Sequence, residues 1–363
     1  MRSKYPPAED AAEELDSSSL VIFLFTRMNS NLSSELQEMF FVILVCTIIL
    51  MALFFKSTES TFNLWFWSKL GPTEEAYFRG KTVWIVGCSS GIGAEIALRL
   101  AQLECRIILS ARRKEKLDEL KAKCDEKLST RSSIVFPLDV TNFGQVAEAC
   151  KKVKMFFGKV DVIILCCGQS QRADWINVDH KVDEACFKVN ALGPTVLARE
   201  YLKTLEADEK GVLPPTHFVV VSSVAGIIGA VLSPSYTAAK HALMGYFRVL
   251  TMEYSSKGIE VSLVCPSLTF APNNVLNAFS GDINKAHGEV LTEPTAAHMS
   301  PARCAQLILL AASNRIAECW LSQKASLLIL CYFSLLMPGI TNRIIQSIGV
   351  ERLKNIRTGG QTN

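Results

Sequence analysis

The chain of 363 residues is long enough for one large domain with appendages, or for two small domains. Its 38 basic and 35 acidic side chains leave a net charge of +3, too close to balance to indicate a nucleic-acid partner. Apolar residues make up 49% of the chain, a share that favours contact with a membrane. The 12 cysteines form no C-x-x-C pair and no metal-binding spacing with histidine, so we interpret them as reduced packing residues and expect no metal site.

The amino-terminal part combines a polar lead with an apolar run. Residues 1–38 are mostly polar and acidic, and we expect them to be largely disordered. Residues 39–55 carry no charge and would extend about 25 Å as a helix, near the lower limit for a membrane span. We favour a single-pass membrane anchor over a cleaved signal peptide or a buried core helix. Lys56 and Lys69 favour a cytosolic catalytic domain, and the sequon at Asn31 is compatible with a luminal amino terminus.

The regions on either side of the expected folded domain are also rich in apolar residues. Residues 56–80 are interpreted as a linker whose aromatic side chains suit a membrane interface. The catalytic domain is expected at 81–322, followed by a hydrophobic and amphipathic extension at 323–363. Beyond Pro338, apolar residues recur at near-helical spacing, and basic residues lie among them. This pattern is typical of a helix that lies on a membrane, and equally of one that packs against the domain or a second subunit.

Short apolar strands alternate with helical segments along the expected domain. A strand at 82–86 leads into a glycine-rich turn at 87–93 and then into a helical stretch at 94–102. Further strands are expected at 106–110, 134–138, 161–165, 217–222, 259–264 and 317–322. Charged helices are expected at 114–127 and 143–157. This alternation predicts an α/β fold, a Rossmann-like, doubly wound parallel sheet of about seven strands with helices on both faces.

The first strand and the second strand both end in residues that suit a dinucleotide. The turn offers backbone N–H groups to a pyrophosphate through Gly87, Ser89, Ser90, Gly91, Ile92 and Gly93. The second strand is followed by Arg112 and Arg113, with no acid before Glu115. A carboxylate here would bind a ribose 2′-hydroxyl, whereas arginine suits a 2′-phosphate. The pair therefore predicts NADP(H) rather than NAD(H), with a solvated basic helix start as the alternative.

The stretch 222–241 carries the candidate catalytic residues. Tyr236 and Lys240 are four apart, so on a helix both side chains project from one face. A neighbouring ammonium lowers the pKa of a phenol, which would make Tyr236 a proton donor and acceptor near neutral pH. Ser223 could hold a substrate oxygen beside the phenol. Because Y-x-x-x-K occurs often by chance, this assignment depends on the motifs that precede it.

Taken together, these motifs resemble the classical short-chain dehydrogenase/reductase family over about residues 80–322. The resemblance implies four catalytic residues: Asn190, Ser223, Tyr236 and Lys240. It implies a cofactor site that adds Asp139, Val140, Gly168 and Pro266 to the glycine-rich turn, Arg112, Arg113, Asn190, Tyr236 and Lys240. More narrowly, the stretches LSARR, GQSQR and YTAAKHAL are similar to the membrane-bound group called dehydrogenase/reductase SDR family member 7.

We therefore expect an NADP(H)-dependent oxidoreductase acting on CH–OH groups. Contact with a membrane would favour a lipophilic carbonyl or alcohol as substrate, such as a retinoid or a steroid. Tyr236 would donate the proton, Lys240 would also hold the nicotinamide ribose, and Ser223 would polarise the carbonyl. Asn190 would support a water that relays protons. Membrane localisation in the endoplasmic reticulum is expected, and a homodimer is compatible with the family.

The sequence departs from the family pattern at several positions around the cofactor site. Val86 replaces a threonine, Leu165 and Cys166 stand where the family has two asparagines, and Ser267 replaces a glycine. These changes motivate an alternative, a catalytically weak NADPH-binding scaffold or sensor, although the intact catalytic residues argue against it. A second alternative is an NAD-dependent alcohol oxidase, which the two arginines disfavour.

Overall fold

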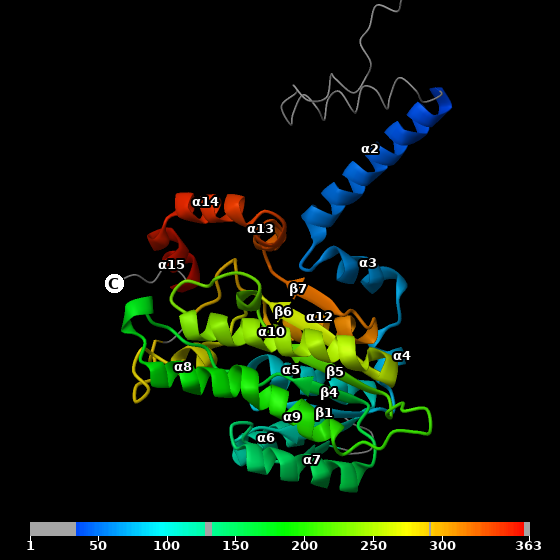
Figure 1. Cartoon of the computed structure of the whole chain (residues 1–363), viewed down its shortest axis with the longest axis vertical. Helices are drawn as coiled ribbons and strands as arrows, with labels where there is room; N and C mark the ends of the chain where they lie inside the picture. The colour runs from blue at the N-terminus through cyan, green and yellow to red at the C-terminus, as the bar shows by residue number, and fades with distance from the viewer. Residues whose placement is uncertain (1–33, 128–132, 290–291, 359–363) are drawn as a thin grey trace, which may run out of the picture. The chain divides into compact units, whose positions relative to one another are not determined.

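The computed structural model describes residues 34–127, 133–289 and 292–358 (Figure 1). The expected disorder of residues 1–38 therefore lies almost wholly outside the described residues. The chain divides into two compact units after Ser57, and each unit is considered by itself.

The first unit contributes one described helix, α2 (Ser34–Ser57), which contains the apolar run. The hydroxyl of its polar residue Thr47 forms a hydrogen bond within the helix, because Thr47 Oγ1 donates to the Ile43 carbonyl at 2.8 Å. Among the described residues, no helix combines the length and the apolar character needed to cross a membrane. The predicted anchor at 39–55 is therefore helical but is not confirmed as a span.

The second unit is built on one parallel sheet of seven strands in the order β3-β2-β1-β4-β5-β6-β7. The strands are β1 (Thr82–Val86), β2 (Arg106–Ser110), β3 (Ser133–Val135), β4 (Val162–Leu165), β5 (Thr216–Val221), β6 (Ile259–Pro266) and β7 (Glu318–Leu321). The strand order reverses between β1 and β4, which makes their carboxyl ends the topological switch point. The predicted fold class, a doubly wound parallel sheet, is confirmed.

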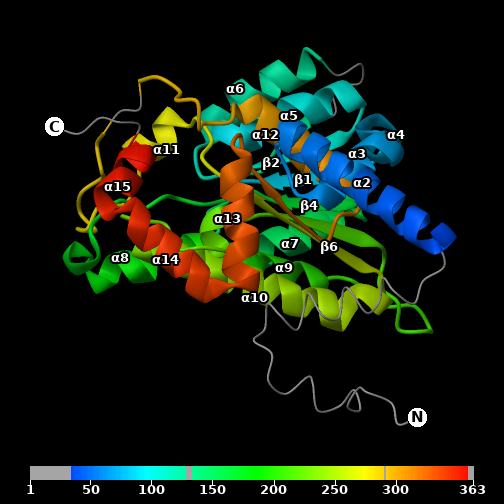
Figure 2. The same ribbon diagram turned by 90° about the horizontal axis from the view of Figure 1, so that it is seen from above.

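Helices cover both faces of this sheet (Figure 2). One face packs against α5 (Gly91–Leu100), α6 (Lys114–Asp125) and α12 (Pro301–Ser313), and the other against α7 (Phe143–Phe157), α9 (Gly193–Leu202) and α10 (Pro234–Tyr254). Alternate side chains of β1 are buried on opposite faces of the sheet. Val83 and Ile85 lie in the core beneath α5, α6 and α12, whereas Trp84 and Val86 lie in the core beneath α7, α9 and α10. A strand buried on both faces must be apolar throughout, and β1 is.

Strand β3 is shorter than the predicted strand at 134–138. Regular pairing ends at Val135, although Phe136 N–H still donates to the Leu109 carbonyl at 2.8 Å. The reason is Pro137, which has no N–H to donate to the ladder.

Most of the expected linker at 56–80 belongs to the folded second unit. Residues 58–61 run antiparallel to β7: Ser60 forms a bridge with Leu321, and Thr61 N–H donates to the Trp320 carbonyl at 3.0 Å. Two helices follow, α3 (Phe62–Leu70) and α4 (Glu74–Phe78), and both bury side chains in the core. The physical reason is the edge of the sheet, since an unpaired β7 would expose a row of N–H and C=O groups.

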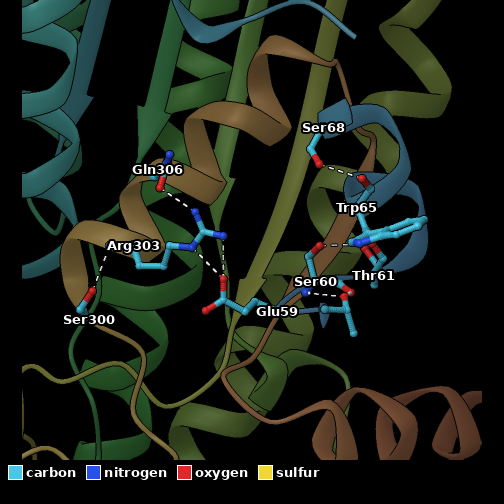
Figure 3. Close-up of polar contacts among 9 residues, drawn as sticks. Glu59, Ser60, Thr61, Trp65, Ser68, Ser300, Arg303 and Gln306 are labelled. Atoms are coloured by element: carbon cyan, nitrogen blue, oxygen red, sulfur yellow. Dashed lines mark hydrogen bonds and ion pairs between the residues drawn. The ribbon is translucent and has the colours of Figure 1, made fainter. Parts of the chain in front are cut away.

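A side-chain contact reinforces this edge (Figure 3). The Arg303 guanidinium on α12 forms an ion pair with Glu59 at 2.7 Å and donates to Gln306 Oε1 at 2.7 Å. The Arg303 backbone N–H donates to the Ser300 hydroxyl, which caps the helix. The segment before α3 is thus fixed to the sheet and to α12 together.

The extension at 323–363 forms three helices: α13 (Ala325–Leu336), α14 (Pro338–Ile348) and α15 (Val350–Thr358). Helix α13 packs on the domain, because Leu328 and Cys331 are buried and the rings of Tyr332 and Trp320 lie 4.8 Å apart. Helix α15 is tied to the loop after β4 by an ion pair between Lys354 and Asp174 at 3.4 Å.

Candidate active site

A cavity of about 1100 Å³ opens at the carboxyl ends of β1, β4, β5 and β6. This is the switch point of the sheet, where open α/β folds bind their ligands. The cavity brings together every predicted site residue except Asn190, so the glycine-rich turn and the Tyr/Lys pair share one space.

The glycine-rich turn begins at Gly87, where only glycine fits. Its φ is +92°, and a Cβ here would fall 2.5 Å from the Cys167 backbone nitrogen. The Gly87 N–H donates to the Ser110 carbonyl at 2.7 Å, which joins the turn to β2. Helix α5 then begins at Gly91 beside the cavity, and its unpaired N–H groups favour an anion.

The cysteines around this turn act as packing residues. Cys88 is fully buried, and burial raises the pKa of its thiol to about 12. Burial also raises the pKa of Cys166 to about 12 and that of Cys167 to about 11. Neutral thiols are poor nucleophiles, so these side chains serve as small packing groups. The Cys166 N–H still donates to the Val86 carbonyl at 2.8 Å, which keeps the ladder intact despite both departures.

Two arginines form a basic rim beside the turn. Arg112 and Arg113 are exposed and line the cavity, and Arg113 Nη2 donates to Ser89 Oγ at 3.3 Å. In the part of the chain that the structure describes, neither guanidinium forms an ion pair with a carboxylate. On the neighbouring strand end, Asp139 Oδ1 accepts from the Thr141 N–H at 2.9 Å and from its hydroxyl at 2.8 Å.

Asn190 lies behind the cavity wall. It sits in a π-helical turn, η3 (Lys188–Leu192), between α8 (His180–Phe187) and α9. Its Oδ1 accepts from the Gln169 N–H at 3.1 Å, and its Nδ2 donates to the carbonyls of Gln169 and Cys186, each at 2.9 Å. The fully buried side chain therefore holds the loop after β4. The predicted role in supporting a water stays a prediction.

Gly168 allows the Asn190 amide and the Lys240 ammonium to lie close to each other. A Cβ at Gly168 would fall 2.8 Å from Asn190 Oδ1 and 3.5 Å from Lys240 Nζ. The loop can thus pass between the amide and the ammonium only where no side chain is present.

Tyr236 and Lys240 lie on the first turns of α10, which begins at Pro234. Lys240 Nζ lies 5.7 Å from the centre of the Tyr236 ring and donates to the Val221 carbonyl at 3.2 Å. The lysine is only 3% exposed, and no described carboxylate lies within ion-pair distance of it. Its ammonium is therefore available to an anionic or polar group in the cavity.

Ser223 follows β5 and caps a short turn, η4 (Val224–Gly226). Its Oγ accepts from the Ala225 N–H at 3.2 Å and donates to the Pro266 carbonyl at 3.3 Å. The hydroxyl thus joins two strand ends next to Tyr236, and a rotation of its O–H would redirect the donor into the cavity.

One residue of the cavity was missed by the sequence reasoning: Arg172 lines it from the loop after β4. The segment from Ser267 to Phe279 closes another side. A basic residue shortly after a strand end was the available signal for Arg172. Across the described ranges, no group of histidine, cysteine or acidic residues could hold a metal ion.

Residues 81–277 match the family model described as short chain dehydrogenase. The chain belongs to the short-chain dehydrogenase family. Human dehydrogenase/reductase SDR family member 7 is 31% identical over 329 residues, which cover 89% of this chain and 94% of that protein. The bovine member 7B is 30% identical over 292 residues, which cover 79% of this chain and 86% of that protein. The predicted family resemblance, including the similarity to member 7, is confirmed, and the chain is an oxidoreductase of this family.

Solved structures share the fold. A short-chain dehydrogenase from Streptomyces avermitilis matches with a TM-score of 0.59 and 23% identity, over 74% of this chain and 98% of that chain. An alcohol dehydrogenase from the archaeon Thermococcus sibiricus, complexed with 5-hydroxy-NADP, matches with a TM-score of 0.57 and 20% identity. That match covers 68% of this chain and 97% of that chain.

Proposed function

We propose that the protein is an NADP(H)-dependent oxidoreductase that interconverts carbonyl and hydroxyl groups on a lipophilic substrate. One observation carries this proposal: Tyr236, Lys240 and Ser223 line the same cavity as the glycine-rich turn and its basic rim. A site with both parts can hold a dinucleotide and present a proton donor to a substrate beside it.

The cavity fits the phosphates of a dinucleotide. A Cβ at Gly91 would meet open space at the start of α5, which leaves room for a pyrophosphate against the N–H groups. Arg112 and Arg113 offer guanidinium groups to a 2′-phosphate, which supports NADP(H) over NAD(H). The archaeal relative of the same fold was solved with an NADP derivative, which agrees with this preference.

The residues of the chain account for the proton and for the orientation of the carbonyl. When bound, a reduced nicotinamide supplies a hydride to the carbonyl carbon. The Tyr236 hydroxyl gives its proton to the oxygen, and the buried Lys240 ammonium stabilises the phenolate that remains. The Ser223 hydroxyl donates to the same oxygen after it leaves the Pro266 carbonyl. Asn190 acts by fixing the loop at Gln169.

Contact with a membrane is part of the proposal. Large apolar side chains are exposed on α13 and α14, with Leu336 at 75% and Ile340 at 48%, and in the loop after β4, with Trp175 at 78% and Ile176 at 88%. Exposed apolar groups beside basic ones such as Arg343 are typical of surfaces that lie on a bilayer. A substrate that partitions into lipid would then reach the cavity from the membrane.

The test is NADPH consumption by membranes that carry the protein, with retinal, steroid ketones and aromatic carbonyls as substrates. Replacing Tyr236 with Phe is expected to lower turnover by about 100-fold or more, because the proton donor is lost, while NADPH binding stays nearly unchanged. NADH should support turnover poorly. Unchanged turnover in Tyr236→Phe would remove the tyrosine from its role, and NADPH binding without any turnover would favour the scaffold function.

A further inference from the structure

Arg172 occupies a fixed position in the cavity wall. Its backbone N–H donates to the Phe279 carbonyl at 2.8 Å, and Gln171 forms a parallel bridge with Phe279. The next residue, Ala173, donates to the Leu232 carbonyl at 3.0 Å, in the loop before α10. The arginine is thus held between the segment that closes the cavity and the loop that leads to Tyr236. This position is outside the glycine-rich turn and its basic rim.

The guanidinium of Arg172 lacks a partner within the described part of the chain. Its Nε is buried and makes no hydrogen bond, and no ion pair joins the guanidinium to a carboxylate. Glu289 lies near enough to raise the pKa of Arg172, but its carboxylate is exposed and pairs with His287 at 2.9 Å. The other buried cation of the cavity, Lys240, does have a protein acceptor in the Val221 carbonyl.

A half-buried cation without a partner is unfavourable unless a ligand supplies the counter-charge. Arg172 lines the same cavity as Tyr236, and burial lowers the pKa of its guanidinium. Apolar side chains line the cavity beside it, among them Leu268, Val275 and Phe279. This combination suits a ligand with an apolar body and one anionic group.

We propose that Arg172 is a specificity-determining residue that binds an anionic oxygen group, a carboxylate or a sulfate ester, on the substrate. The inference rests on the proposed function and narrows the substrate to apolar carbonyl compounds, and the corresponding alcohols, that carry a carboxylate or a sulfate ester. The planar guanidinium can donate two parallel hydrogen bonds to such a group. The anchored anion would then set how far the carbonyl reaches toward Tyr236.

The experiment compares matched aldehydes with the full-length protein in its membranes and NADPH. Terephthalaldehydic acid and azelaaldehydic acid are each paired with their methyl esters, and formylphenyl sulfate tests the sulfate ester. The wild type is expected to favour the acids in kcat/KM. Arg172→Met should lower kcat/KM for the acids by about 10- to 100-fold, the range expected for a hydrogen-bonded charge, and leave the esters unchanged. Arg106→Gln, at an exposed arginine on β2, is the matched control and should change neither.

A second measurement keeps the test valid if Arg172→Met does not fold. Dodecanoate should inhibit reduction of a methyl-ester aldehyde by the wild type competitively, at least 10-fold more strongly than dodecanol, and Arg172→Lys should weaken that inhibition. Equal kcat/KM for acids and esters in the wild type would overturn the inference while the proposed function stands. A changed NADPH affinity in Arg172→Lys would instead assign the arginine to the cofactor and overturn it as well. If the wild type reduces neither these aldehydes nor retinal and the steroid ketones, the proposed function fails, and calorimetric binding of dodecanoate to the NADPH complex decides the anion site alone.

Discussion

At the scale of single residues, the cavity depends on groups that never enter it. Asn190 is fully buried behind the wall, yet its amide forms two hydrogen bonds with Gln169 in the loop after β4 and donates a third to the Cys186 carbonyl on α8. The same loop carries Gly168 and, four residues later, Arg172. One buried amide therefore holds the loop that carries both the glycine beside Lys240 and the arginine.

Gly168→Ala tests this arrangement. The new Cβ would fall 2.8 Å from Asn190 Oδ1, so either the amide or the loop must move. We expect kcat to fall about 10-fold or more and the protein to lose about 1–3 kcal/mol of stability, as in other overpacked sites. Gly229→Ala is the control, because a Cβ there meets nothing within 4 Å and should leave both quantities unchanged. An unaltered kcat in Gly168→Ala would mean that the hydrogen bonds of Asn190 do not position the catalytic groups.

At the scale of elements, the contribution of α3 to the core decides how much of the amino-terminal region is structural. Leu64 is fully buried, whereas Leu70 on the same helix is 67% exposed. Leu64→Ala is expected to lower the free energy of unfolding by about 2–5 kcal/mol, because it leaves a cavity in the core. Leu70→Ala should change it by less than about 0.5 kcal/mol. Thermal unfolding of the two purified variants measures the difference, and equal effects would show that α3 does not pack on the domain in solution.

The elements also show what could be predicted from the sequence and what could not. The β1 strand, the turn at Gly87 and the spacing of Tyr236 and Lys240 are local patterns, and the structure has them at the predicted positions. The pairing of Ser60 with Leu321 joins residues about 260 apart in the chain, and no local pattern indicates it. The aromatic content of residues 62–67 suits a membrane interface and a packed helix equally well, so composition alone could not distinguish the two.

At the scale of the whole second unit, a buried histidine links stability to pH. His217 lies on β5, an inner strand of the sheet, and is 3% exposed. Its Nδ1 lies 2.8 Å from the Tyr77 hydroxyl and its Nε2 lies 2.9 Å from the Ser262 hydroxyl, which suit a neutral ring. Burial, together with the positive charges of Lys81 and Arg315, lowers the pKa of His217 from 6.5 to about 3.

The sign of the pH dependence follows from this shift. Below pH 6.5 the unfolded chain binds a proton at His217 that the folded protein does not accept until about pH 3. Stability is therefore expected to fall as the pH drops through this window, by up to about 1.4 kcal/mol per pH unit from this group.

His217→Gln, which keeps a polar side chain but cannot be protonated, should remove that part of the slope and cost some stability at pH 8. His241→Gln, at an exposed histidine on α10 whose ring Nδ1 lies 2.9 Å from the Thr237 carbonyl, is the matched control. Denaturant unfolding at several pH values compares the three slopes, and an identical slope in His217→Gln and wild type would show that the folded protein accepts the proton at this site.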